Sequence, residues 1–353
     1  MQELIENHRV IVCTGSGGVG KTTLSAALGV YAAQLGKRVL VLTIDPARRL
    51  ATTLGIDQSA DEARVPGQNY PGTLYAGMID QSRIFADYIQ RHAADRKTVD
   101  ALFGNALYQQ LSTTLSGSQE FTSLSKLVDA TGSGCYDLVI LDTPPATHAV
   151  DFLHAPQKLN AVFDSTIVSM FMGRATGFKL ASDAWKSGVK LLLHTLTFLT
   201  GSEFIATFSS FFSAIDAIAP DIRATNLEAH RLLLDPGTAF VLITSFDQAK
   251  IIEGEAFRDE LAAAGYRLKH VIVNRAWPAW AAPDSPQIQA TQEDLRHRHR
   301  EDLAALHRKL CDYYATRAQA HTRFENILKL TEFDDEIVGL PSLERLAARL
   351  SES

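Results

Sequence analysis

Residues 15–22 read Gly-Ser-Gly-Gly-Val-Gly-Lys-Thr, and this stretch decides how the rest of the chain is interpreted. It satisfies the pattern G-x-x-x-x-G-K-[ST], in which a glycine-rich turn joins a strand to a helix. Glycines let the backbone curl until several N–H groups point at one anion, and the next helix adds its positive amino end. Lys21 can reach terminal phosphates, and the Thr22 hydroxyl can bind Mg²⁺. The stretch therefore predicts a site for a nucleoside triphosphate with magnesium.

The flanking segments have the character that this motif requires. Val10–Thr14 is a short apolar run, which predicts a buried strand. Residues 22–36 are rich in Ala and Leu, which predicts a helix closed by Gly36. Residues 38–44 predict a second strand. The alternative, a chance glycine-rich turn, is disfavoured because strand, helix and strand together form a βαβ unit with a right-handed crossover.

Three later apolar runs predict further core strands: Leu138–Leu141, Phe240–Ile243 and Val271–Val273. Because helical stretches separate them, the pattern predicts an α/β fold with a doubly wound, mostly parallel sheet. We expect residues 1–353 to form a single domain of this kind, with an inserted all-helical subdomain.

The helical subdomain is predicted from two long stretches between the strands, residues 80–131 and 159–234. Residues 276–289 contain three prolines and predict a surface loop. Residues 293–330 carry dense alternating charges and predict one solvated helix. Residues 1–10 show no basic-then-apolar leader and are expected to run straight into the first strand.

Composition narrows the class of protein further. Apolar residues make up 46% and charged residues 21% of the chain, and the formal net charge is -6. Nucleic-acid binding usually shows as a net basic domain, so no nucleic-acid partner is expected. Cys13, Cys135 and Cys311 are few and far apart, which disfavours a disulfide framework or a Cys-x-x-Cys zinc site. The cytoplasm is the expected compartment.

Two acidic residues end predicted strands. Asp142 precedes Thr143-Pro144-Pro145, and at the carboxyl end of a core strand it is placed to hold Mg²⁺ through water. The alternative is a plain strand-terminating turn. Asp45 can orient or deprotonate an attacking water; the alternative is a helix N-cap followed by Pro46 at the first helical position.

Several segments resemble one family. They are SGGVGKTT (16–23), LTIDPARRLATTLG (42–55), DTPPATHAVDFLHAP (142–156) and, less specifically, Ser116–Leu127 and Gly339–Leu350. Together they resemble the ArsA-type ATPases, which include the arsenite-pump ATPase and the ATPase that targets tail-anchored membrane proteins. The family belongs to the deviant Walker A group with MinD and ParA.

The resemblance implies a role for each matching residue. Asp45 would activate the water, Lys21 would contact the phosphates, and Asp142 would support magnesium together with Thr22. Asn274 would read the adenine ring through its amide, which offers a donor and an acceptor; the alternative is a turn residue after a strand. The implied phosphate cradle consists of Gly17, Gly18, Val19, Gly20, Lys21, Thr22 and Thr23.

The chain departs from the family pattern at Ser16, where members usually carry a lysine that reaches across a dimer to the partner's phosphates. A cation supplied in trans accelerates phosphoryl transfer. Arg48 or Arg49 is one replacement, although a solvated pair at a helix start is the preferred interpretation. A second possibility is that a paralogous subunit supplies the lysine. The third possibility is that the protein is a slow ATPase or a binding switch.

The apolar segment 191–215 contains one formal charge, Glu203. Because Gly201-Ser202-Glu203 interrupts it, two helices joined by a turn fit better than a membrane span. These helices either bury their apolar faces within their own domain or line a groove for a hydrophobic client helix. The candidate groove residues are Met170, Met172, Phe198, Phe204, Phe208, Phe211 and Phe212.

These observations predict an ATP-hydrolysing switch that couples nucleotide state to dimer closure and to the helical subdomain. A slow hydrophobic-helix chaperone, the energising subunit of an anion pump and a positioning ATPase stay open as alternatives. The expected partners are a second copy or a paralogue carrying the lysine, and either a hydrophobic helical client or a membrane-protein partner.

Overall fold

The computed structural model describes residues 1–44, 49–56, 62–93, 95–105, 108, 116–144, 202–277, 286–319, 324–333 and 335–352. The chain divides into two compact units. The first consists of Met1–Ile79, Asp129–Asp151 and Leu232–Ser353, and the second of Asp80–Val128 and Phe152–Arg231.

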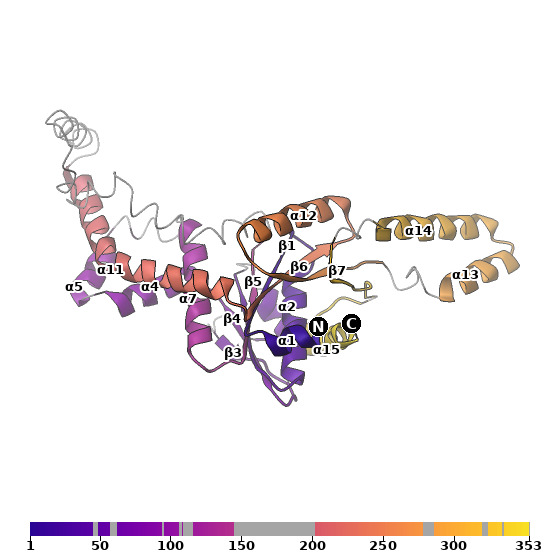
Figure 1. Cartoon of the computed structure of the whole chain (residues 1–353), viewed down its shortest axis with the longest axis horizontal. Helices are drawn as coiled ribbons and strands as arrows, with labels where there is room; N and C mark the ends of the chain where they lie inside the picture. Colours follow the sequence, from indigo (N-terminus) through magenta and orange to yellow (C-terminus); the bar gives the residue numbers. More distant parts are fainter. Residues whose placement is uncertain are drawn as a thin grey trace. The chain divides into compact units, whose positions relative to one another are not determined.

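An eight-stranded sheet forms the centre of the first unit (Figure 1), in the order β3-β4-β2-β5-β1-β6-β7-β8. All neighbours pair in parallel except β3, which is antiparallel to β4 at one edge. The strands are β1 (Val10–Gly15), β2 (Arg38–Thr43), β3 (Glu62–Arg64), β4 (Thr73–Met78), β5 (Leu138–Asp142), β6 (Thr238–Ser245), β7 (Leu268–Asn274) and β8 (Ile327–Lys329). The predicted α/β, mostly parallel fold is confirmed.

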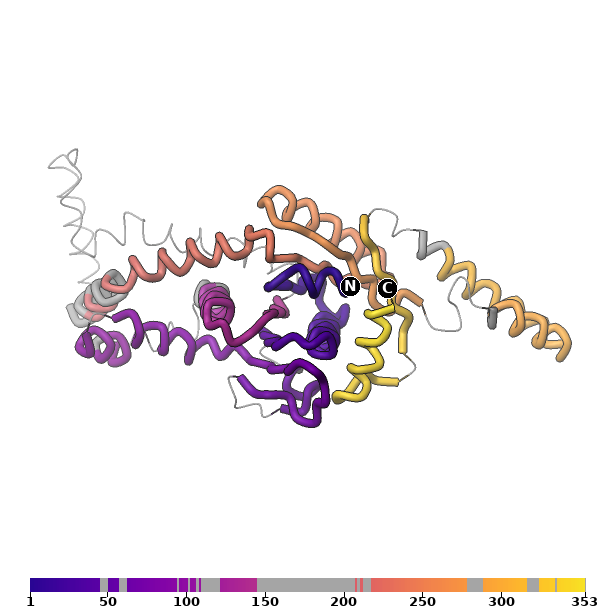
Figure 2. The backbone as a smooth tube through the Cα atoms, turned by 60° about the horizontal axis from the view of Figure 1, so that its bottom comes forward, coloured from indigo at the N-terminus to yellow at the C-terminus, as the bar shows by residue number. Residues whose placement is uncertain are grey.

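Helices cover both faces of this sheet. Side chains alternate between the faces along each strand, so the buried strands present apolar side chains on both. On β6, Val241 and Ile243 join the cluster that also contains residues of α1 (Gln2–Asn7), α2 (Lys21–Gln34), α3 (Arg49–Leu54) and α15 (Gly339–Ser351). Leu242 points the other way, toward Gly254 of α12 (Gln248–Ala263), where an added Cβ would lie 3.3 Å from it. Figure 2 shows α15 beside the amino-terminal elements, with the two termini close together.

Close packing of α2 on the sheet depends on Gly29. A Cβ at this position would lie 2.5 Å from Val41 and 2.9 Å from Leu74, so a side chain there would push the helix away from the strands. Because α2 begins at Lys21, the fit of Gly29 also fixes the height of the phosphate loop above the strand ends.

Residues 276–330 differ from the prediction. The helix expected over 293–330 is two helices, α13 (Pro286–His297) and α14 (Glu301–Gln319), followed by β8. His299 lies between them with φ 53°, a left-handed conformation that ends α13. The loop expected over 276–289 gives way to α13 at Pro286, and proline suits a first helical position.

Other elements were not predicted. Residues 1–10 contain the short helix α1 rather than running directly into the strand. Strands β3, β4 and β8 were also missed. Two of them have only three residues each, and β4 carries Ala76 and Gly77, which are poor strand formers.

Helices α13 and α14 pack side by side as a hairpin (Figure 1). One side of α14 faces inward: Ala304 is buried, and the ring of Tyr314 lies 6.0 Å from that of Phe246, the residue after β6. Next to this side, α14 exposes large apolar side chains at spacings of three and four residues, namely Leu303, Leu306, Leu310 and Tyr313.

The second unit contains α4 (Gln81–His92), α5 (Arg96–Phe103) and most of α7 (Ser116–Gly132) and α11 (Ser202–Leu234). Its core includes Tyr88, Phe121 and Phe211. For Phe211, burial within its own unit is therefore the interpretation that the structure supports, rather than a place in an open groove. Met170, Met172 and Phe198, and the side chains of Phe204, Phe208 and Phe212, lie outside the described part.

The boundaries expected for the helical insertions, 80–131 and 159–234, stay predictions, because residues 145–201 are not among those described. None of the helices within the described ranges combines the length and hydropathy needed to cross a bilayer.

Candidate functional site

The candidate site lies at the carboxyl edge of the parallel strands. Of the strands that follow β1 in the chain, β2, β3, β4 and β5 lie on one side of it in the sheet, and β6, β7 and β8 lie on the other side. The order of the sheet thus reverses at β1. Ligands of open α/β sheets bind at such a switch point, outside the carboxyl ends of the strands. Gly15, Asp142 and Asn274 end β1, β5 and β7 at this edge.

The phosphate loop, Gly15–Thr22, depends on glycine at three positions. A Cβ on Gly15 would lie 1.9 Å from the Ile243 carbonyl oxygen, so the backbone at the start of the loop packs too closely on β6 to leave room for a side chain. Gly18 and Gly20 have φ values of 78° and 90°, in the left-handed region that other residues rarely adopt. Gly20 caps α2 without a side-chain hydrogen bond, so this cap leaves the first N–H groups of the helix for an anion.

Lys21 is buried, with 8% of its surface exposed. Its Nζ donates to the Ser16 carbonyl oxygen at 2.9 Å, which folds the side chain back over the loop. A buried ammonium is costly to desolvate unless it is paired, and a polyphosphate bound in the loop would supply stronger partners.

Asp142 is 2% exposed and lies between β1 and β2, in register with Cys13 and Thr43. Its Oδ2 accepts hydrogen bonds from the hydroxyls of Thr22, at 2.6 Å, and Thr43, at 2.9 Å. The buried carboxylate and the hydroxyl of Thr22 are hard oxygen donors of the kind that Mg²⁺ prefers, together with waters and substrate phosphates. These residues therefore fit a magnesium ion. Among the described residues, no cluster of three or more His, Cys, Asp or Glu forms a metal cage.

Asn274 contacts the phosphate loop directly. Its Nδ2 donates to the Val19 carbonyl oxygen at 2.8 Å, and its Oδ1 accepts from the Arg275 backbone N–H at 3.0 Å. The fit to Gly20 is tight, because a Cβ there would lie 2.5 Å from the Asn274 Nδ2. This contact was not foreseen, since only the pairing of the strands brings β7 to the loop. The adenine-reading role stays a prediction.

One further residue at the site, Thr43, was missed from the sequence, and the hydrogen bond of Thr143 was not foreseen. The Thr143 hydroxyl donates to the Cys13 carbonyl oxygen at 3.0 Å, which ties the segment after β5 to β1. Burial raises the pKa of the Cys13 thiol to about 12, so this cysteine is a packed neutral side chain. Asp45 and Arg48, and the side chain of Arg49, lie outside the described part of the chain.

Replacing Gly20 with alanine is expected to weaken Mg-ADP binding at least tenfold. The new methyl group would meet the Asn274 amide, and alanine at a left-handed φ costs about 1 kcal/mol or more on its own. Calorimetric titration of Mg-ADP measures the effect. Gly67→Ala is the matched control, because Gly67 has a φ of 73° but nothing within 4 Å of its added Cβ. Equal binding by the Gly20 variant and wild type would contradict the geometry.

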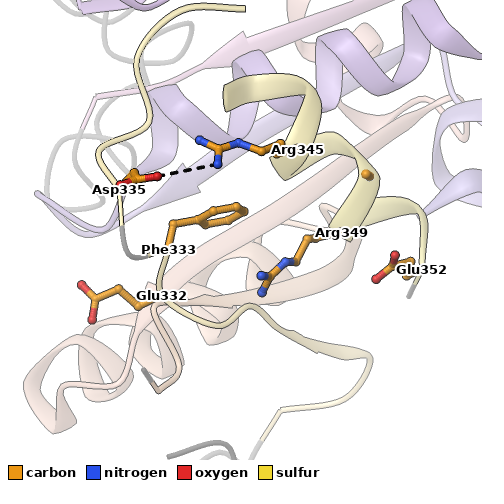
Figure 3. Close-up of a pocket in the computed structure, with 7 residues that line it drawn as sticks. Glu332, Phe333, Asp335, Arg345, Arg349 and Glu352 are labelled. Carbon is orange, nitrogen blue, oxygen red and sulfur yellow. Dashed lines mark ion pairs between the residues drawn. The ribbon is translucent and has the colours of Figure 1, made fainter. Parts of the chain in front are cut away.

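A separate cavity of about 380 Å³ lies between α15 and the segment after β8. Figure 3 shows Arg345 directed at Asp335, with a separation of 3.7 Å. The other arginine, Arg349, lies over the Phe333 ring and hydrogen-bonds Thr331. Both arginines are engaged with protein groups, and none of the residues predicted for nucleotide binding lines this cavity.

The fold and the loop define a P-loop protein of the doubly wound α/β class. The sequence matches the family described as anion-transporting ATPase over residues 8–352. It is 24% identical over 350 residues to the putative arsenical pump-driving ATPase 1 of Aquifex aeolicus, covering 96% of this chain and 78% of that protein. It is 24% identical over 356 residues to the ATPase GET3 of Podospora anserina, covering 99% and 93%. Identity to the arsenical pump-driving ATPase of Escherichia coli is 28% over 313 residues, covering 85% of this chain and 44% of that protein.

The chain belongs to the ArsA family of ATPases. The predicted family is thus confirmed, and with it the predicted class, a nucleotide-binding ATPase. The relatives are named as a putative arsenical pump-driving ATPase and as the ATPase GET3.

Proposed function

We propose that the protein binds Mg-ATP on the phosphate loop and hydrolyses it to ADP and phosphate. The observation that supports this most is the convergence of Lys21, Thr22 and Asp142 at the amino end of α2. These groups supply a cation, a hydroxyl and a carboxylate beside an open helix terminus. That combination suits phosphoryl transfer, in which catalysis consists largely of positioning and charge stabilisation.

Each residue has a distinct part in the proposed reaction. Lys21 leaves the Ser16 carbonyl and contacts the terminal phosphates, while the loop N–H groups orient them. Asp45 orients the attacking water and accepts its proton as the water oxygen bonds to the γ-phosphorus and the bond to the β-phosphate bridge breaks. Thr22 and Asp142 would hold magnesium, which neutralises developing charge on the phosphate oxygens. The segment beginning at Thr143 would move when the γ-phosphate leaves.

We also propose that two chains act together, either two copies or this chain with a paralogue that carries a lysine at the position of Ser16. The apolar face of α14 supports a second copy as the partner. Leu303, Leu306, Leu310 and Tyr313 are each at least 37% exposed, and their three-and-four spacing matches a helix-pairing seam. The cytoplasm stays the proposed compartment.

The remaining alternatives for the function differ in the cargo or partner on which the ATPase acts. A hydrophobic helical client, as for a chaperone, and a membrane partner, as for the energising subunit of an anion pump, are both compatible with an ATP-driven switch. The names of the relatives include an arsenical pump-driving ATPase and the ATPase GET3, and the burial of Phe211 removes one residue from the candidate client groove.

Release of labelled phosphate from ATP, measured as protein concentration rises, tests the proposal. We expect turnover that disappears when EDTA removes magnesium, and specific activity that increases with concentration if two copies form the active unit. Leu306→Lys should shift that increase to higher concentration, while Leu227→Lys, an exposed leucine on α11, should leave it unchanged. Turnover that is indifferent to EDTA would contradict the proposed site.

A further inference from the structure

The side-chain amide of Asn274 makes two hydrogen bonds of opposite sense. Its Oδ1 accepts from the Arg275 backbone N–H at 3.0 Å, which leaves its Nδ2 to face the phosphate loop. That Nδ2 donates to the Val19 carbonyl oxygen at 2.8 Å. Because one end of an amide only donates and the other only accepts, the two contacts together fix the orientation of the group.

The backbone on both sides of Asn274 is tied to the segment that follows β8. The Leu330 N–H donates to the Val273 carbonyl oxygen at 2.9 Å, and the Ala276 N–H donates to the Leu330 carbonyl oxygen at 2.7 Å. The side chains of Val273 and Ala276 are fully buried. The amide of Asn274 therefore offers the phosphate loop a fixed point of attachment.

Val19 is the loop residue that this amide holds, and it lies between two glycines. Gly18 and Gly20 have φ values of 78° and 90°, whereas the Val19 side chain is buried in the core cluster that includes residues of α2. Glycine tolerates φ of either sign, so the peptide group that joins Val19 to Gly20 is free to flip unless it is held. A peptide group is planar and trans, so fixing the Val19 carbonyl also fixes the Gly20 N–H, which points the opposite way.

We infer that Asn274 is a positioning residue of the phosphate loop, a role that rests on the proposed function of this loop. By holding the Val19 carbonyl, its amide keeps the Gly20 N–H directed away from β7 and available to an anion at the amino end of α2. Without this contact the loop would lose more conformational freedom on binding phosphate, which lowers the affinity. Because the amide acts on the backbone that binds phosphate, its effect does not depend on the nucleobase.

Magnesium pyrophosphate, which has the phosphates of ADP but no base, distinguishes this role from the reading of adenine. Asn274→Ala should weaken the binding of Mg-ADP and of Mg-pyrophosphate by the same factor, roughly fivefold, which is the order expected for one hydrogen bond. Asn274→Leu, which keeps the volume of the side chain but removes the donor, should give the same loss. Calorimetric titration of the full chain measures both ligands. If Asn274 read only the adenine, Mg-ADP would bind more weakly to both variants while Mg-pyrophosphate bound as it does to wild type.

The control is Asn7→Ala, at an exposed asparagine of α1, which should leave both affinities unchanged. Urea unfolding identifies the variants that are folded, and either folded Asn274 variant decides the test. Wild-type affinity for Mg-pyrophosphate in such a variant would overturn the inference. So would wild-type protein that binds Mg-ADP but not millimolar Mg-pyrophosphate, because the loop would then not be held ready for phosphate. Failure of the wild type to bind either ligand would instead reject the proposed function.

Discussion

Lys21→Ala is expected to reduce ATP turnover by about a thousandfold. The removed ammonium is the buried cation at the amino end of α2, and groups that stabilise transition-state charge contribute roughly 10²–10³ in rate each. Nucleotide affinity should fall as well, because Lys21 contacts the phosphates before and during the reaction. Single-turnover release of labelled phosphate at saturating ATP separates the two effects.

Lys269→Ala is the control for this change, since Lys269 is exposed near the amino end of β7, away from the strand ends that carry the loop. Urea unfolding should show that the Lys21 variant is folded. A folded Lys21 variant with wild-type turnover would remove the phosphate loop from the reaction.

Asp45→Asn is expected to leave nucleotide binding within about twofold of wild type while turnover falls by a factor of roughly 10²–10⁴, the range for loss of a general base. Asparagine keeps the size of the side chain and a hydrogen-bonding oxygen but cannot accept the proton of the attacking water. Binding is measured by calorimetry and turnover by phosphate release.

Asp142→Asn is expected to act differently from Asp45→Asn, through the magnesium dependence of turnover. That change removes the carboxylate that accepts from Thr22 and Thr43, so it should raise the magnesium concentration needed for half-maximal turnover. If Asp45→Asn hydrolyses ATP at the normal rate, Asp45 is not the residue that activates water.

The sequence was most informative where one local pattern controls the structure. The phosphate loop, the strands around it and the helix after it were predicted because glycine spacing and apolar runs act over a few residues. The stretch 293–330 was misinterpreted because its charges suit a helix throughout, whereas the left-handed His299 divides it and three residues near its end join the sheet as β8.

The contacts within the site depend on strand pairing, which no local pattern encodes. Thr43 reaches Asp142 because β2 lies beside β5, and Asn274 reaches Val19 because β7 ends near the loop. Sequence reasoning could name the residue types that bind phosphate and magnesium, but not the side chains that position them.

Every proposed role requires a triphosphate site between β1 and α2, and calorimetric titration with Mg-ATP and Mg-ADP tests this site most directly. We predict saturable one-to-one binding of both nucleotides to each chain, weakened in Lys21→Ala and unchanged in Lys269→Ala. No detectable heat or saturation with wild-type protein at millimolar nucleotide would contradict the central claim.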